Sequence, residues 1–427
     1  MTELENASLE TTPRRHFTLK KILQGDSIIW TVFFLLCLIS VVEVYSAGST
    51  LSFKSGNYLS PLIKQATFLT VGIVLCVIVH KIPCRIFKLV PILGWPLCVG
   101  LLILTFFIGG DVNNSSRWIP LGAFSFQPSE LAKGVVITAV ALILGNSQRE
   151  EGAHPKAFKQ ILYVTVPVCL LIFTENLSTA AILFAVVFAM MVVGRVPWKQ
   201  LGKLVASGVT IVVLTVALAF AVPKDGVLYE TVFHRFNTWT ERITDMFSSD
   251  SDDGSGIEKG SKEEAAQFIR ENPQVGRAYV AVASSNVVGR MPGNSVERDN
   301  LYQAYSDYIY AIIIEELGIE GGILVVLLYI ILLFRAGRLA SRCERNFPAF
   351  LCMGLAILLV FQASINMMVA VGLFPVTGQT LPLISRGGTA TIINCVYFGM
   401  ILSVSRYARR NRLEDAGKIE LVPISKV

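Results

Sequence analysis

The sequence predicts an all-α protein that crosses a membrane about ten times. Two observations carry this prediction. The 427 residues are 53% hydrophobic and only 16% charged, and the charges are gathered between long apolar runs. Because a bilayer core needs about 20 apolar residues per helix and leaves no backbone polar group unsatisfied, runs of this length form helices and not an open sheet.

Each apolar run is long enough for one crossing, and polar connectors separate the runs. The first run follows a polar tail and lacks a small-residue cleavage site, so we expect a retained helix and not a signal peptide. The predicted spans are 28–47, 61–80, 87–108, 129–146, 158–174, 177–194, 201–222, 307–334, 347–371 and 388–405.

The basic residues predict the orientation. With the N-terminus in the cytoplasm, more than half of the 37 Lys and Arg residues fall in cytoplasmic segments, and the short outer segments hold little besides Lys54, Arg117 and Arg386. Cytoplasmic loops carry the excess of positive charge in membrane proteins, so both termini are expected in the cytoplasm. This distribution explains the net charge of +6 without nucleic acid as a partner.

One outer connector, between the seventh and eighth spans, is far longer than the others. Its stretch 248–264 is acidic and nearly free of apolar residues, as disordered segments are. The expected divisions are a cytoplasmic tail at 1–27, seven spans at 28–222, the large periplasmic loop at 223–306, three spans at 307–406 with a re-entrant loop at 375–388, and a cytoplasmic tail at 407–427.

Charged side chains at membrane depth are costly, so each marks a candidate site. Asp307 stands where the outer loop meets the eighth span, which suits a general base acting on a sugar hydroxyl; Ser306 or Asp307 would equally serve as a helix N-cap. Glu130 and Lys133 lie on one helical face, where they either bind a pyrophosphate with Arg117 or only pair with each other.

Three further segments have a structural and a functional interpretation. Residues 375–388, which include Ser385 and Arg386, interleave apolar residues with Gly and Pro, as in a re-entrant loop, with a tight outer turn as the alternative. Glu315 and Glu316 are interpreted as hydrogen-bonding groups between helices. Glu43 and Glu175 receive no catalytic role. The histidines and cysteines show no metal-ligand spacing.

Taken together, these segments resemble the SEDS family (shape, elongation, division and sporulation), the peptidoglycan polymerases with about ten spans. The resemblance runs from about Ile28 to Arg410. It rests on the motifs Arg117-Trp118-Ile119, Gln127-Pro128-Ser129-Glu130 with Lys133, Ser306-Asp307, Glu315-Glu316-Leu317-Gly318 and Thr380-Leu381-Pro382-Leu383-Ile384-Ser385. The last motif is closer to the division branch, FtsW, than to the elongation branch, RodA.

The chain also departs from the family pattern. Tyr305 stands where histidine is usual, Arg386 stands where tyrosine is usual, and Asn176 lies where the family tends to have P-D-[LF]-G. These departures concern the geometry of loops.

The resemblance implies a bacterial inner-membrane glycosyltransferase that polymerises lipid II at the division septum, with its active site facing the periplasm. It implies inversion at the anomeric carbon with Asp307 as general base, and makes Glu130 and Lys133 the family's paired charges. Arg117, Lys133, Arg386 or a divalent cation, Mg²⁺ or Mn²⁺, would offset the charge of the leaving diphosphate, and Ser385 is a further candidate for substrate binding. No cofactor or metal ligand follows with certainty.

The implied partners are lipid II, a class B penicillin-binding protein that crosslinks the strands, other division proteins and membrane lipid. Two rival functions remain open from the residues. One is a flippase that transports lipid II, and the other is a non-catalytic division scaffold.

Overall fold

The chain was analysed as a computed structural model, which describes residues 23–48, 59–108, 110–112, 115–121, 124–221, 269–270, 273–301 and 304–415. The acidic stretch 248–264 and both terminal tails lie outside these residues, apart from a few positions next to the first and last helices. The described elements are α2 (Ser27–Ala47), α4 (Ser60–Lys81), η1 (Ile86–Lys88), α5 (Leu89–Ile108), β1 (Gly110–Val112), β2 (Ser115–Leu121), β3 (Phe124–Phe126), α6 (Pro128–Ser147), β4 (Gln148–Arg149), β5 (Gly152–Ala153), α7 (Lys156–Glu175), α8 (Leu177–Val193), α9 (Trp198–Ala221), α12 (Pro273–Ala283), η2 (Glu297–Asp299), α13 (Ile309–Ala340), α14 (Asn346–Ala370) and α15 (Thr389–Asp415).

Helices occupy every predicted span, and the all-α polytopic fold is confirmed. Among the described helices, eight are long and apolar enough to cross a bilayer. Two more correspond to predicted spans: α8 is apolar but has 17 residues, and α9 has 24. The last helices run longer than predicted, because polar residues extend α13 to Ala340 and α15 to Asp415 beyond the apolar stretches that predicted them.

Local sequence signals set several helix starts. The Asp26 carboxylate caps α2 by accepting hydrogen bonds from the backbone N–H of Ile28 at 2.9 Å and of Ile29 at 3.3 Å. Pro128 opens α6, where its missing N–H costs nothing. Asn176 caps α8 by accepting from the backbone N–H of Thr179 at 3.2 Å.

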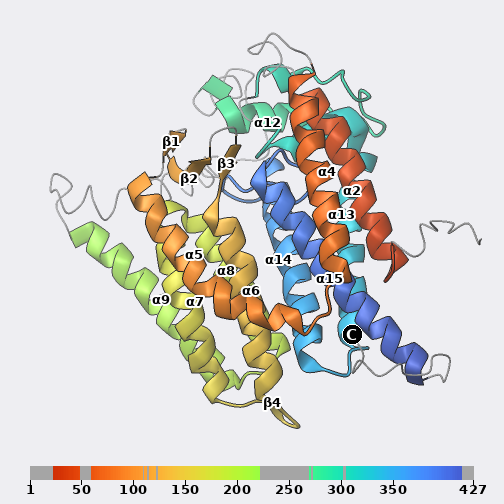
Figure 1. Cartoon of the computed structure of the whole chain (residues 1–427). Helices are drawn as coiled ribbons and strands as arrows, with labels where there is room; N and C mark the ends of the chain where they lie inside the picture. The colour runs from red at the N-terminus through yellow and green to blue at the C-terminus, as the bar shows by residue number, and fades with distance from the viewer. Residues whose placement is uncertain are drawn as a thin grey trace, which may run out of the picture.

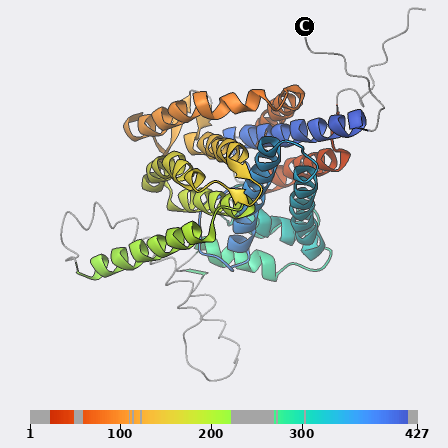
Figure 2. The same ribbon diagram turned by 90° about the horizontal axis from the view of Figure 1, so that it is seen from below.

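The helices form a bundle in which the buried and peripheral members differ (Figure 1). The helices α6, α14 and α15 are mostly buried, whereas α4, α5 and α7 present many apolar side chains outward, as expected of helices that face lipid. Helix α9 projects from the side of the bundle and exposes most of its described side chains (Figure 2).

Short strands, which the sequence did not predict, mark the two ends of the bundle. At one end, called here the sheet end, β1, β2 and β3 form an antiparallel sheet near α12 (Figure 1). Its register pairs Ile119 with Phe126 and Pro120 with Ser125. At the opposite end, called the hairpin end, β4 and β5 pair between α6 and α7.

Candidate active site

Asp307 lies in a turn at the sheet end of the bundle, directly before α13. The Ser306 hydroxyl donates a hydrogen bond to Asp307 Oδ1 at 3.0 Å. The N-cap of α13 is Tyr308, without any side-chain hydrogen bond to the helix start. The N-cap residue is therefore Tyr308 and not Ser306 or Asp307, and the Asp307 side chain is half-exposed.

The predicted loop 375–388 is packed inside the bundle between α14 and α15. Its residues Leu381 to Ser385 are buried. A non-helical segment in such a place needs partners for its carbonyl groups. Side chains from two helices provide partners here: the Tyr329 hydroxyl of α13 donates to Pro382 O, and the Ser40 hydroxyl of α2 donates to Ile384 O at 2.8 Å.

The C-terminal part of this loop is bonded to the segment that carries Asp307. Ser385 Oγ donates to Ser306 O at 2.6 Å and accepts from the backbone N–H of Leu381 at 2.7 Å. The backbone N–H of Arg386 donates to Tyr305 O at 3.0 Å. The structure thus brings Ser385 and Arg386 next to Asp307, although they are almost 80 residues away in sequence.

The Arg386 side chain stacks on Tyr305, with the guanidinium carbon 5.4 Å from the ring centroid. Both residues are departures from the family pattern, and here they form a cation–π pair. Partial burial lowers the pKa of Arg386, and Tyr305 opposes that shift. The Arg386 side chain is partly exposed beside the segment that carries Asp307.

Glu130 and Lys133 form a buried ion pair on α6, at 2.8 Å between Lys133 Nζ and Glu130 Oε1. Lys133 is completely enclosed. Its ammonium also donates to Gln362 Oε1 on α14 at 3.0 Å, and Gln362 Nε2 donates to Thr380 O in the loop at 3.3 Å. The Glu130–Lys133 pair is therefore connected to loop 375–388 through Gln362 of α14.

Asn366, one turn after Gln362 on α14, completes this connection. Its Nδ2 donates to Asp307 O at 2.8 Å and to Gln379 O at 2.7 Å. Gln379 Nε2 in turn donates to Thr179 Oγ1 on α8 at 2.8 Å. A single buried amide thus joins α14, the loop and the turn that carries Asp307.

The sequence analysis missed Gln362 and Asn366. The signal was present, because two amides spaced i, i+4 in an otherwise apolar helix lie on one face and need buried partners. Neutral amides cost less at membrane depth than charged groups do, so they mark a site less clearly in a sequence.

Arg117 lies on β2, in the sheet that joins α5 to α6. The structure describes the backbone of Arg117, and its side chain falls outside the described part. Next to the sheet, Thr389 Oγ1 at the start of α15 donates to Ser125 O at 3.1 Å. The sheet is therefore attached to the same end of the bundle as the loop.

Glu316 makes the predicted hydrogen bond between helices, to Ser46 of α2, and both glutamates also bond to the segment before α13. The Glu315 carboxylate accepts from the Ser295 hydroxyl and, at 2.9 Å, from the backbone N–H of Val296. Glu316 accepts from the backbone N–H of Ser295 at 3.3 Å and from the Ser46 hydroxyl. Both glutamates therefore fasten the outer segment before α13 onto the bundle.

A metal site made by protein ligands alone is not found among the described residues. No group of three or more His, Cys, Asp and Glu side chains there is arranged to hold a metal ion. Mg²⁺ commonly takes several of its ligands from phosphate oxygens and water.

The comparisons with known proteins agree with this architecture. The "cell cycle protein" family that comprises FtsW, RodA and SpoVE matches residues 26–410. A probable peptidoglycan glycosyltransferase FtsW from Halomonas elongata is 30% identical over 386 residues, which cover 88% of this chain and 89% of the relative. The FtsW of Pseudomonas fluorescens, described in the same words, is 29% identical over 87% of this chain and 85% of its own.

Solved structures share the fold. A chain of a peptidoglycan synthase complex, studied for the coordination of polymerization and crosslinking, superimposes with a TM-score of 0.62 at 23% identity, covering 90% of this chain and 99% of its own. The rod shape determining protein RodA of Thermus thermophilus gives 0.59 at 23% identity, with 90% and 98% coverage. The chain therefore belongs to the FtsW/RodA/SpoVE family of multi-pass membrane proteins.

Proposed function

We propose that this protein is a peptidoglycan glycosyltransferase that polymerises lipid II at the bacterial inner membrane, with Asp307 as the general base. The observation that carries the proposal is the environment of Asp307. A partly exposed carboxylate lies on a turn whose backbone is held by Asn366 and whose neighbour Ser306 is held by Ser385. A fixed position suits a general base, because the carboxylate must lie within hydrogen-bond distance of the substrate hydroxyl whose proton it takes.

The chemistry follows from this position. Asp307 takes the proton of the acceptor sugar hydroxyl while the oxygen attacks the anomeric carbon of the donor glycan. The bond to the lipid diphosphate breaks on the opposite face, so the configuration inverts, and the diphosphate departs with the electron pair. The proton remains on Asp307 until it is released to water.

Positive charge at the site assists departure of the diphosphate. Arg386 is suited to this role, because its guanidinium is partly exposed and lies beside the segment that carries Asp307. Arg117 is the second candidate, from its place on β2. Lys133 is fully enclosed and already bound by two oxygens, so in our proposal it stabilises the loop and does not contact the phosphates.

Gly378 lies beside the proposed base. A Cβ atom at this position would lie 3.6 Å from Asp307 Oδ2, an ordinary van der Waals distance, and the backbone has a φ of +61°. Left-handed backbone of this kind is readily adopted by glycine. The backbone conformation, and not a lack of space, therefore explains the glycine.

We further propose the expected cell biology and topology. Both termini face the cytoplasm, the sheet end with loop 223–306 faces the periplasm, and loop 375–388 is re-entrant. The protein acts at the division septum with a class B penicillin-binding protein and other division proteins. The support is the distribution of Lys and Arg, the match to FtsW relatives and the fold shared with a chain of a peptidoglycan synthase complex.

The decisive experiment is polymerisation of labelled lipid II by purified protein carrying Asp307→Asn. Loss of a general base lowers the rate about 10²- to 10⁴-fold. Glu320→Gln is the matched control, since Glu320 is an exposed carboxylate on the same helix, and it should retain wild-type activity. A folded Asp307→Asn variant with undiminished polymerisation would refute the proposal.

Assays of the same purified protein distinguish the two rival functions, a lipid II flippase and a non-catalytic scaffold. Reconstituted vesicles that move lipid II across the bilayer, in a manner dependent on Glu130 and Lys133 but not on Asp307, would support a flippase. Wild-type protein that binds its transpeptidase yet forms no polymer, with or without added Mg²⁺ or Mn²⁺, would support a scaffold.

A further inference from the structure

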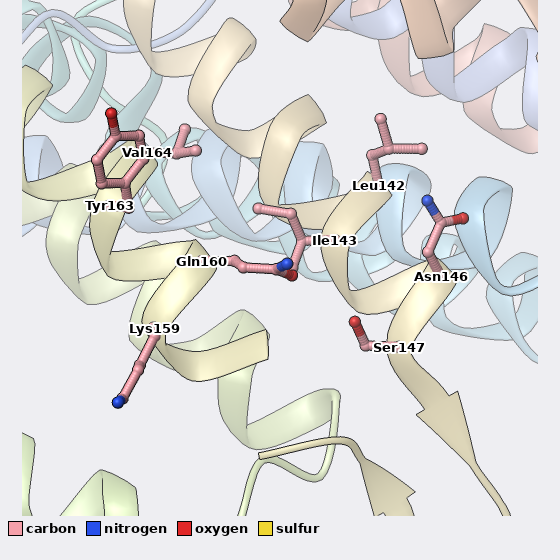
Figure 3. Close-up of a pocket in the computed structure, with 8 residues that line it drawn as sticks. All are labelled: Leu142, Ile143, Asn146, Ser147, Lys159, Gln160, Tyr163 and Val164. Carbon is pink, nitrogen blue, oxygen red and sulfur yellow. The ribbon is translucent and has the colours of Figure 1, made fainter. Parts of the chain in front are cut away.

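We propose that a groove between α6 and α7 at the hairpin end binds one anionic phospholipid of the cytoplasmic leaflet. The groove is far from Asp307, on the other end of the bundle, and its volume is about 800 Å³. Figure 3 shows the residues that line it: Leu142, Ile143, Asn146, Ser147, Lys159, Gln160, Tyr163 and Val164.

The α7 wall is polar along one helical stripe. Lys156, Lys159, Gln160 and Tyr163 recur at intervals of three or four residues, so their side chains share a face. Both lysines are exposed and lie in the first turns of the helix. Lys159 lines the groove, and Lys156 lies one turn before it on the same helical face, where the proposed orientation puts the phosphate groups of the cytoplasmic leaflet.

The polar groups of the groove are free to bind a ligand. Within the described part of the chain, no hydrogen bond or ion pair engages the side chains of Asn146, Ser147, Lys159 or Gln160. In Figure 3 the Ser147 hydroxyl and the Gln160 amide face the space between the helices, and the Lys159 side chain points away from both, toward the outer side of α7. A phosphate bound between the helices would accept from Ser147 and Gln160, with the charge of Lys159 nearby.

The remainder of the groove is apolar and faces the membrane. Leu142 and Ile143 on α6 and Val164 on α7 line it above Ser147 and Gln160 (Figure 3). Trp95 of α5 donates from Nε1 to Val164 O at 3.0 Å, three residues before Pro167 interrupts the hydrogen-bond ladder of α7. This contact fixes the wall of the groove close to the point where the helix would otherwise be weakest.

The groove has a polar rim and an apolar wall, and this combination determines which ligand fits it. A free phosphate would leave the apolar wall unfilled, and an acyl chain without an anionic headgroup would leave the lysines unused. An anionic phospholipid satisfies both parts through charge and apolar contact. The inference uses the proposed orientation, and it does not depend on the catalytic role of Asp307.

The test is native mass spectrometry of the full chain titrated with phosphatidylglycerol and, separately, with phosphatidylcholine. Wild-type protein should retain one phosphatidylglycerol more tightly than phosphatidylcholine. Lys159→Gln should weaken that retention about fivefold, as expected for one lysine near a lipid phosphate. Lys203→Gln, which removes an exposed lysine of α9 outside the groove, should leave it unchanged.

A second measurement uses wild-type protein only. A photoreactive phosphatidylglycerol should crosslink to the peptides 142–147 and 159–164, and unlabelled phosphatidylglycerol should prevent this where phosphatidylcholine does not. Equal retention of the two lipids, equal effects of Lys159→Gln and Lys203→Gln, or competed crosslinks confined to other helices would each overturn the proposal.

Discussion

The Asn366 side chain is the contact through which α14 determines where Asp307 lies. Its hydrogen bond to Asp307 O is 2.8 Å long and partly buried, and its hydrogen bond to Gln379 O is 2.7 Å long and buried. Neither bond touches the Asp307 carboxylate. Asn366 is therefore a positioning residue, and its loss should change the placement of the base without changing its chemistry.

Asn366→Leu keeps the approximate volume and removes both hydrogen bonds. We expect kcat for lipid II polymerisation to fall about 100-fold, because a misplacement of about 1 Å costs that much. KM should change little. Asn394→Leu, at an equally buried amide on α15, should leave kcat near the wild-type value. A rise in KM with unchanged kcat would instead assign Asn366 to substrate binding.

Variants of Lys133 and Glu130 can show whether this ion pair contributes to stability only or also to activity. Lys133→Met leaves the Glu130 carboxylate buried without its cation, and should lower the free energy of unfolding by about 3–5 kcal/mol. Adding Glu130→Gln should restore most of that loss, because a neutral amide tolerates the site. Thermal denaturation in detergent measures both variants.

The activity of the double variant then decides the role of the pair. If the pair only stabilises packing, polymerisation recovers with stability. If it holds the loop in place through Gln362, stability recovers while kcat remains low.

At the scale of elements, α13 owes its shape to one glycine. Gly318 interrupts the helix with φ +74° and ψ −177°. The segment Val287 to Gly289 packs directly against this point, and a Cβ on Gly318 would lie only 2.1 Å from Val287 O. Together with Glu315 and Glu316, the break fastens the outer segment to the bundle.

Gly318→Ala should detach this segment. The strained backbone costs about 1–3 kcal/mol, and the clash with Val287 O must be relieved by moving the segment away. Trypsin should then cleave faster at Arg290 and Arg298. Gly337→Ala, on the same helix with open space around it, should leave cleavage unchanged and stabilise α13 by about 0.5–1 kcal/mol. Unaltered cleavage in Gly318→Ala would show that the glycine does not hold the segment.

The helices could be predicted from the sequence because the bilayer leaves no backbone polar group without a hydrogen bond. A long apolar run therefore has to form a helix. The observed helix α6 (Pro128–Ser147) agrees with the predicted 129–146 within one residue. The short strands could not be predicted, since pairing at Ile119 and Phe126 depends on contacts made after the helices assemble.

The candidate site was predictable where charge marked it and unpredictable where neutral groups form it. The proximity of Ser385 and Arg386 to Asp307 came from motif resemblance, and the structure supplies the reason in the bonds to Ser306 and Tyr305. A hydrogen bond from Glu316 to another helix was predicted and is found at Ser46 of α2, whereas the bond to Ser295 could not be foreseen, because Ser295 lies in a non-helical segment.

For the whole molecule, the two ends of the bundle differ in chemistry in the way a membrane orientation requires. The sheet end carries Asp307, the loop and the segment before α13. The hairpin end carries Arg149, Arg195 and the first lysines of α7, in connectors that fit the excess of positive charge expected in the cytoplasm.

Cysteine labelling in spheroplasts tests this orientation directly. Leu373→Cys lies at an exposed position in the turn after α14, and Glu151→Cys lies at the exposed tip of the β4–β5 hairpin. A maleimide that cannot cross membranes should label Leu373→Cys in intact spheroplasts, and should label Glu151→Cys only after permeabilisation. The eight native cysteines are buried or partly buried, so the unsubstituted protein gives the background. Labelling of Glu151→Cys before permeabilisation would reverse the orientation. It would put Asp307 on the cytoplasmic side, where no extracytoplasmic glycan could reach it.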